Sequence, residues 1–98
     1  MIPVRSFARS TVAVFGLART GRAALRALLA GGAEVVAWDD NAGARQTGSE
    51  EGARIAPWRD WEWEGIAALV LSPGVPLTHP LPHEIVRHAK DAGVPVIG

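Results

Sequence analysis

Short apolar runs alternate with amphipathic segments along the chain. Residues 11–15 (TVAVF), 34–39 (EVVAWD) and 66–72 (IAALVLS) are apolar at nearly every position, which is typical of strands buried on both faces of a parallel sheet. Residues 20–30 predict a helix, because apolar positions recur there at the spacing of one helical face: Gly21, Ala24, Leu25 and Leu28. The first strand, this helix and the second strand together have the size of a parallel crossover unit.

The middle of the chain gives weaker patterns. Residues 40–53 are polar and glycine-rich, so we expect mostly loop there, with at most one helical turn. Residues 54–56 (RIA) predict a short third strand, and residues 57–65 (PWRDWEWEG) predict one helical turn.

The end of the chain returns to regular structure after a loop. Prolines interrupt residues 73–82 (PGVPLTHPLP), so this segment is expected to be irregular. Residues 83–93 then predict a helix, and residues 94–98 (VPVIG) predict a last strand. Pro95 has no backbone N–H to donate to a neighbouring strand, so this strand is expected at a sheet edge.

This alternation of strands and helices predicts an α/β fold. We expect a Rossmann-like open parallel five-stranded sheet, with strand order 3-2-1-4-5 and helices on both faces. The winding direction then reverses between the first and fourth strands, and ligands of such sheets bind at this switch point, outside the carboxyl ends of the strands. The loops at residues 16–21 and 72–76 are expected to meet there.

The loop after the first strand, GLARTG, is a variant of the dinucleotide fingerprint with alanine in place of the middle glycine. Gly16 suits the tight turn after the strand, and Gly21 lets the helix lie close to the sheet. Free N–H groups between Ala18 and Gly21 would attract an anion at the helix start. Thr20 could add a hydroxyl and Arg19 a cation. On its own, this loop slightly favours glycines that serve only the chain geometry.

Two further features are expected at the same edge of the sheet. Asp39 ends the second strand at about the spacing of a ribose-binding acid, although it could instead cap the strand end, and Asp40 could play either part. Ser72, Pro73 and Gly74 suit a type II turn after the fourth strand. That turn would either expose N–H groups toward the crevice or simply lead out of the sheet.

Composition narrows the possible functions. The chain has 98 residues, which is one small domain, and its ten basic residues equal its ten acidic ones. This balance argues against a nucleic-acid or membrane surface. The chain has no cysteine, so it has neither disulfides nor a thiolate metal site, which fits a reducing cytoplasm. It also has no uninterrupted apolar stretch of the roughly 18 residues that a membrane span needs.

Other chemically active side chains fit simpler roles. The three histidines, at positions 79, 83 and 88, miss the H-E-x-x-H metal spacing by one residue. Trp58, Trp61 and Trp63 could form a platform for bases, but hydrophobic cover for the sheet is the better interpretation. The chain has no P-loop motif, and Lys90 is its only lysine.

Three stretches together resemble the N-terminal domain of the Mur ligases of peptidoglycan synthesis: VAVFGLARTGRAA, VVAWDD and, most specifically, LVLSPGVPLTHP. The resemblance covers about residues 10–98. It implies a Rossmann-like domain that holds the UDP end of the substrate rather than NAD.

The resemblance also implies a role for individual residues. Arg19 and Thr20, with the amides of Ala18 and Gly21, would face the diphosphate. The uracil end would lie at Asp39, Asp40 and Asn41, with Asn41 standing where an arginine over the uracil is expected. Gly16, Ser72 and Gly74 would line the same cleft.

At the level of the whole protein, the resemblance implies that residues 1–98 form the UDP-substrate-binding domain of a longer three-domain ligase. Its substrate would be UDP-N-acetylmuramoyl-L-alanine. ATP, Mg²⁺ and a carbamylated lysine would belong to a central domain, and D-glutamate to a C-terminal one. Residues 1–98 would then hold no catalytic group or metal and would be an inactive, cytoplasmic monomer by themselves. Two alternatives remain: an NAD(P)-binding domain of an oxidoreductase or sensor, and a structural module with an empty crevice.

Overall fold

A computed structural model describes residues 6–72 and 84–97. The regular elements follow one another in the order β1 (Thr11–Phe15), α1 (Arg19–Ala30), β2 (Glu34–Trp38), α2 (Ala42–Glu50), β3 (Arg54–Ile55), β4 (Ile66–Leu71), α3 (Glu84–Asp91) and β5 (Val96–Ile97). Two 3-10 turns, Trp58–Asp60 and Trp63–Gly65, lie between β3 and β4.

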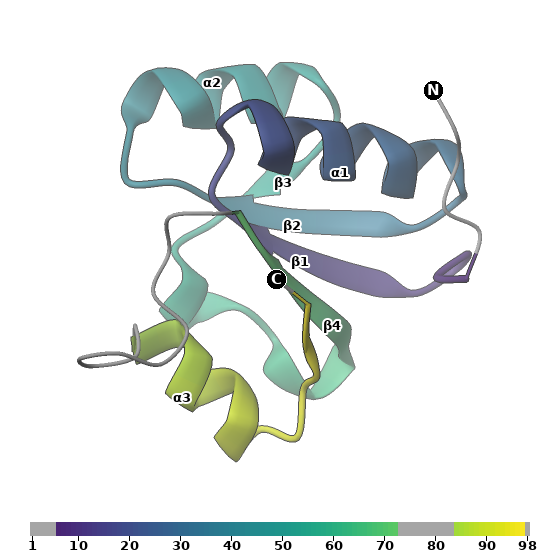
Figure 1. The fold of residues 1–98 in the computed structure, drawn as a ribbon, viewed down its shortest axis with the longest axis vertical. Coiled ribbons are helices and arrows are strands. Elements are labelled where there is room, and N and C mark those ends of the chain that lie inside the picture. The colour runs from purple at the N-terminus through teal and green to yellow at the C-terminus, as the bar shows by residue number, and fades with distance from the viewer. Residues whose placement is uncertain (1–5, 73–83, 98) are drawn as a thin grey trace.

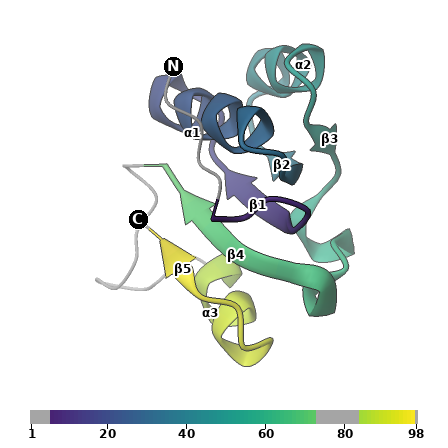
Figure 2. The same ribbon diagram turned by 90° about the vertical axis from the view of Figure 1, so that its right-hand side faces the viewer.

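The strands form one parallel sheet in the order β3-β2-β1-β4-β5. Helices α1 and α2 lie on one face of the sheet, and α3 lies on the other with the two 3-10 turns (Figures 1 and 2). The predicted fold class, strand order and two-sided helical cover are therefore confirmed. The reversal between β1 and β4 places the switch point in the middle of the sheet.

Side chains of β1 alternate between two apolar cores. Val12 and Val14 point to the α1/α2 face, where they pack with Leu17, Leu25 and Leu28. The residues between them belong to the other core, on the α3 face: Ala13 and Phe15. Because both faces of the strand are covered, its sequence is apolar at consecutive positions rather than alternating.

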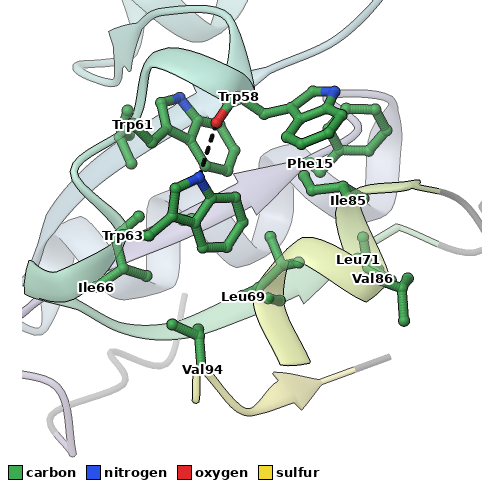
Figure 3. Packing of buried hydrophobic residues seen from close by; sticks show 13 residues of the cluster. Phe15, Trp58, Trp61, Trp63, Ile66, Leu69, Leu71, Ile85, Val86 and Val94 are labelled. Carbon is green, nitrogen blue, oxygen red and sulfur yellow. Dashed lines mark hydrogen bonds between the residues drawn. The ribbon is translucent and has the colours of Figure 1, made fainter. Parts of the chain in front are cut away.

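Three tryptophans fill the core on the α3 face (Figure 3). Trp58, Trp61 and Trp63 are 6–8% exposed and pack with α3 and with the β4 side chains that point to this face. The indole N–H of Trp63 donates to the carbonyl of Trp58 at 2.9 Å, and that of Trp61 to the carbonyl of Ala56 at 2.8 Å. These bonds satisfy the polar atoms that buried indoles carry, and the tryptophans serve as hydrophobic cover.

Two expectations for the middle of the chain were wrong. Residues 40–53 contain a nine-residue helix, α2, rather than mostly loop. Asn41 starts this helix, because its side-chain oxygen accepts from the N–H of Ala44 at 2.9 Å. Gly48, which favours a loop in the sequence, is instead a contact point: a Cβ there would lie 2.8 Å from a terminal methyl of Leu17.

The second wrong expectation concerns residues 57–65, which form two short 3-10 turns where one helical turn was predicted. Each turn begins at a buried tryptophan, Trp58 or Trp63, and the buried Trp61 lies between the two turns, so packing of these side chains breaks the segment in two. The short third strand and the edge position of the last strand are confirmed. At that edge the carbonyl of Pro95 accepts from the N–H of Leu69 at 2.9 Å.

Candidate functional site

The turn after β1 depends on two glycines. Gly16 has φ +97°, a conformation that favours glycine. Its N–H donates to the carbonyl of Trp38 at 2.9 Å, which extends the sheet by one bond. A Cβ at Gly21 would lie 1.7 Å from the carbonyl oxygen of Gly16. Both glycines therefore have geometric roles, and together they bring the start of α1 onto the end of β1.

The start of α1 lacks the features that normally neutralise a helix N-terminus. Ala18 is the N-cap residue and provides no side-chain hydrogen bond, and the first turn contains no acidic residue. Ala18, Arg19 and Thr20 are exposed. The first amides of a helix have no partner within it, and the helix dipole makes this end positive. The loop therefore presents free N–H groups, a hydroxyl and a guanidinium to an anion.

Asp39 joins this loop to the next crossover. Its carboxylate accepts from the N–H of Leu17 at 2.7 Å and from the N–H of Asn41 at 2.8 Å. Asp39 therefore caps the end of β2, which is one of the two roles that the sequence left open for it. A carboxylate has about four lone-pair sites, so these two bonds leave Asp39 able to accept from a ligand as well. Its predicted role at the uracil end stays a prediction.

Asp40 and Asn41 point to structural partners. The indole N–H of Trp38 lies 3.3 Å from a carboxylate oxygen of Asp40, and Asn41 caps α2. Both residues are exposed and lie just after the end of β2, where the sequence predicts them. Their contacts with a nucleoside stay predictions.

On the other side of the turn, Ser72 follows β4. Ser72 is 8% exposed, and its N–H donates to the carbonyl of Phe15 at 3.1 Å. A Cβ at Gly16 would lie 2.7 Å from the Ser72 side chain, so these two residues lie in direct contact. Gly74 and the rest of the loop at residues 73–83 lie outside the described residues, as do His79 and His83.

Arg45 belongs to the same cluster and was not predicted. Its guanidinium lies 4.4 Å from the centre of the Trp38 ring and donates to the carbonyl of Asp39 at 2.8 Å. It stands one helical turn after Asn41, so only a prediction of α2 could have placed it there. The contact between Asp39 and the N–H of Leu17 was missed as well, because nothing in the local pattern links positions 22 residues apart.

Beyond the loop, an ion-pair cluster ties α1 to the end of α2. Arg22 and Arg26 both donate to the same carboxylate oxygen of Glu51, Arg22 at 3.1 Å. The hydrogen bond from Arg26 is the main cause that holds the pKa of Glu51 below its ordinary value of 4.5, although partial burial acts in the opposite direction.

Other binding sites were sought within residues 6–72 and 84–97. No group of three or more histidine, aspartate or glutamate side chains there could hold a metal ion. A cavity of about 280 Å³ lies at the amino ends of β1 and β2 beside Thr11, Glu34 and Arg54. A more open one of about 660 Å³ lies beside Trp61, Trp63 and His88. Within the same residues, no helix has the length and apolar character that crossing a membrane requires.

The fold and its glycine turn define a Rossmann-like domain, and solved structures agree. Shikimate dehydrogenase from Aquifex aeolicus superimposes with a TM-score of 0.72 at 15% identity, covering 93% of this chain and 42% of that one. Shikimate 5-dehydrogenase from Thermus thermophilus, solved in complex with shikimate, gives a TM-score of 0.64 at 26% identity, over 98% of this chain and 42% of that one. These similarities establish the fold alone.

Curated relatives are more specific. The chain is 54% identical to the UDP-N-acetylmuramoylalanine--D-glutamate ligase of Phenylobacterium zucineum, 56% to that of Caulobacter sp. K31 and 59% to that of Bradyrhizobium diazoefficiens. Each match covers all 98 residues of this chain and 21% of the relative. No family model matches the chain. The predicted resemblance to the N-terminal domain of such a ligase is confirmed, and the chain spans about a fifth of the relatives' length.

Proposed function

We propose that this chain is the substrate-anchoring domain of a ligase that adds D-glutamate to UDP-N-acetylmuramoyl-L-alanine, and that it holds the UDP moiety. The uncapped, acid-free start of α1 at the switch point carries the proposal, because it offers free amides to an anion. The relatives support the identity of that anion, since they are named as ligases of a UDP-linked substrate and D-glutamate.

Within the site, the diphosphate lies against the exposed first turn of α1, with the hydroxyl of Thr20 and the guanidinium of Arg19 beside it. The nucleoside extends over the end of β2, toward Asp39, Asp40 and Asn41. Ser72 forms the opposite side of the crevice, and the position of Gly74 there stays a prediction from the sequence. The position of β2 next to β1 in the sheet supports this direction.

The proposed reaction takes place in a longer, cytoplasmic, monomeric protein. ATP, with Mg²⁺, transfers its terminal phosphoryl group to the alanine carboxylate and leaves as ADP. The amine of D-glutamate then attacks the acyl phosphate carbon, the amide bond forms and inorganic phosphate leaves. Residues 1–98 contribute substrate binding to this sequence and are inactive alone.

Amide NMR on the 98-residue chain tests the proposal. UDP should shift the amide signals of residues 18–21 and of Asp39 in a saturable way, and NADH should not. A response to NADH alone would contradict the proposal and favour the alternative of an NAD(P)-binding domain. D-Glutamate serves as a control that should leave these signals unchanged, because its site is placed on another domain.

A further inference from the structure

Asp39 is the one side chain among the described residues that bonds both to the glycine loop and to the start of α2. It lies at the end of β2, half-buried, and one carboxylate oxygen accepts from each segment. The bond from Leu17, at 2.7 Å, is in the range of short, charge-assisted hydrogen bonds. The guanidinium of Arg45 adds a third tie through the Asp39 carbonyl.

The position of this carboxylate conflicts with simple electrostatics. A negative charge directly beside an anion site repels the anion, yet Asp39 bonds to the residue just before the first exposed turn of α1. The conflict disappears if the carboxylate acts on the loop rather than on the diphosphate. By binding the N–H of Leu17, it fixes the peptide plane between Gly16 and Leu17, and so constrains the direction of the amides that follow from Ala18 onward.

We infer that Asp39 is a positioning residue, which holds the glycine loop in the conformation whose free amides receive the diphosphate. This inference rests on the proposed function, since it concerns the same anion site. It also assigns the N–H of Leu17 to the protein itself, so that the diphosphate is received by the amides from Ala18 onward.

The test compares Asp39→Asn and Asp39→Ala with the natural chain, using inorganic pyrophosphate and UDP as probes. Asparagine keeps the shape and one acceptor oxygen, and alanine removes both acceptors. Positioning predicts that hydrogen exchange of the Leu17 amide becomes at least about tenfold faster in Asp39→Ala and that pyrophosphate affinity falls about tenfold. Asp39→Asn should give intermediate values and keeps the test usable if the alanine variant does not fold.

The sign of the change in affinity decides the outcome. If the charge of Asp39 acted on the anion directly, its removal would strengthen pyrophosphate binding. Unchanged or tighter pyrophosphate binding in both variants would therefore overturn the inference, as would a Leu17 amide that stays protected in Asp39→Ala. Binding constants are read from the NMR signals of the folded protein, so a general loss of stability does not imitate the fall in affinity. Exchange of the Leu17 amide is compared with that of the core amides of β1, which a general loss of stability would accelerate as well.

Glu50→Gln is the matched control, since it removes one negative charge from the exposed far end of α2. It should leave both the Leu17 exchange rate and pyrophosphate affinity unchanged. Failure of the proposed function would be visible separately, because the natural chain would then bind neither UDP nor pyrophosphate. Failure of the positioning inference is visible only in the comparison between the natural chain and the two Asp39 variants.

Discussion

The two faces of the sheet are covered by different means. On one face, glycines let α1 and α2 lie close to the turn after β1, and an ion-pair cluster on Glu51 joins the two helices. On the other face, three tryptophans fill the space between α3 and the strands (Figure 3). Gly21 and Gly48 let the two helices lie close to the turn after β1, where the start of α1 is exposed. The tryptophans on the other face instead bury their polar atoms. Binding is therefore assigned to the α1/α2 face, and much of the stability to the α3 face.

Among the substitutions that test this difference between the faces, Trp63→Ala should have the largest effect, a loss of stability. Trp63 is 7% exposed, and its ring centre lies 5.4 Å from that of Trp61. Loss of so large a buried side chain costs about 3–5 kcal/mol, a large part of the 5–15 kcal/mol expected for a domain. Urea denaturation measures the loss. The UDP affinity of the protein that remains folded should be unchanged, and a parallel loss of affinity would break the separation between the faces.

Gly21→Ala, on the opposite face, should lower both the stability of the domain and its affinity for UDP. Its Cβ would overlap the carbonyl oxygen of Gly16 at 1.7 Å, so the helix must move away from the turn. We expect about 2–3 kcal/mol of destabilisation and a loss of UDP affinity of more than about tenfold. Denaturation and NMR titration measure the two effects.

Gly48→Ala is the matched control for Gly21→Ala. Its Cβ would meet a terminal methyl of Leu17 at 2.8 Å, which can rotate, rather than backbone. It should therefore cost less than about 1.5 kcal/mol. A larger cost at Gly48 than at Gly21 would show that the close approach of α2, not that of α1, determines the packing of this face.

Thr20→Val sharpens the assignment of binding within the α1/α2 face. Thr20 is exposed, so stability should change by less than about 0.5 kcal/mol. Loss of a hydroxyl that bonds to a charged group should weaken UDP binding about tenfold. Thr47→Val serves as control, since that hydroxyl donates to the carbonyl of Gly43 within α2, at 3.1 Å. Equal effects of the two substitutions would argue against a diphosphate at the start of α1.

The smallest expected effect concerns Glu51, which joins the two helices of the same face. Because its pKa is lowered in the folded state, Glu51 stabilises the fold above its ordinary pKa of 4.5, and this stabilisation is lost as the pH falls through the lower folded pKa. Partly exposed ion pairs contribute little, so Glu51→Gln should cost no more than about 1 kcal/mol at neutral pH. Urea midpoints measured from pH 7 to 2 should converge for the two proteins, and a constant difference would contradict the role of its charge.

The sequence predicts the parts of this molecule that local patterns determine. Strands such as Thr11–Phe15 and the helix Arg19–Ala30 show their pattern directly, and the right-handedness of crossovers limits the strand orders that are possible. The turn at Gly16 and the acid at Asp39 are visible for the same reason, because each stands at the end of an apolar run.

Tertiary contacts determine the parts that were missed. Helix α2 contains Gly43, Thr47, Gly48 and Ser49, which are poor helix formers, so local propensity favours a loop. Its stability comes from the Asn41 cap and from packing on Leu17. Arg45 and the bond between Asp39 and Leu17 depend on that helix and on a contact between two loops. No periodicity within either segment encodes these contacts.

A crystal structure of the protein with UDP tests the central claim most directly. The account predicts diphosphate oxygens within hydrogen-bonding distance, about 3 Å, of the amides that begin α1, with the uracil beyond the end of β2. A diphosphate in the cavity beside Trp61, Trp63 and His88, or in the one at the amino ends of the strands beside Arg54, would contradict the claim.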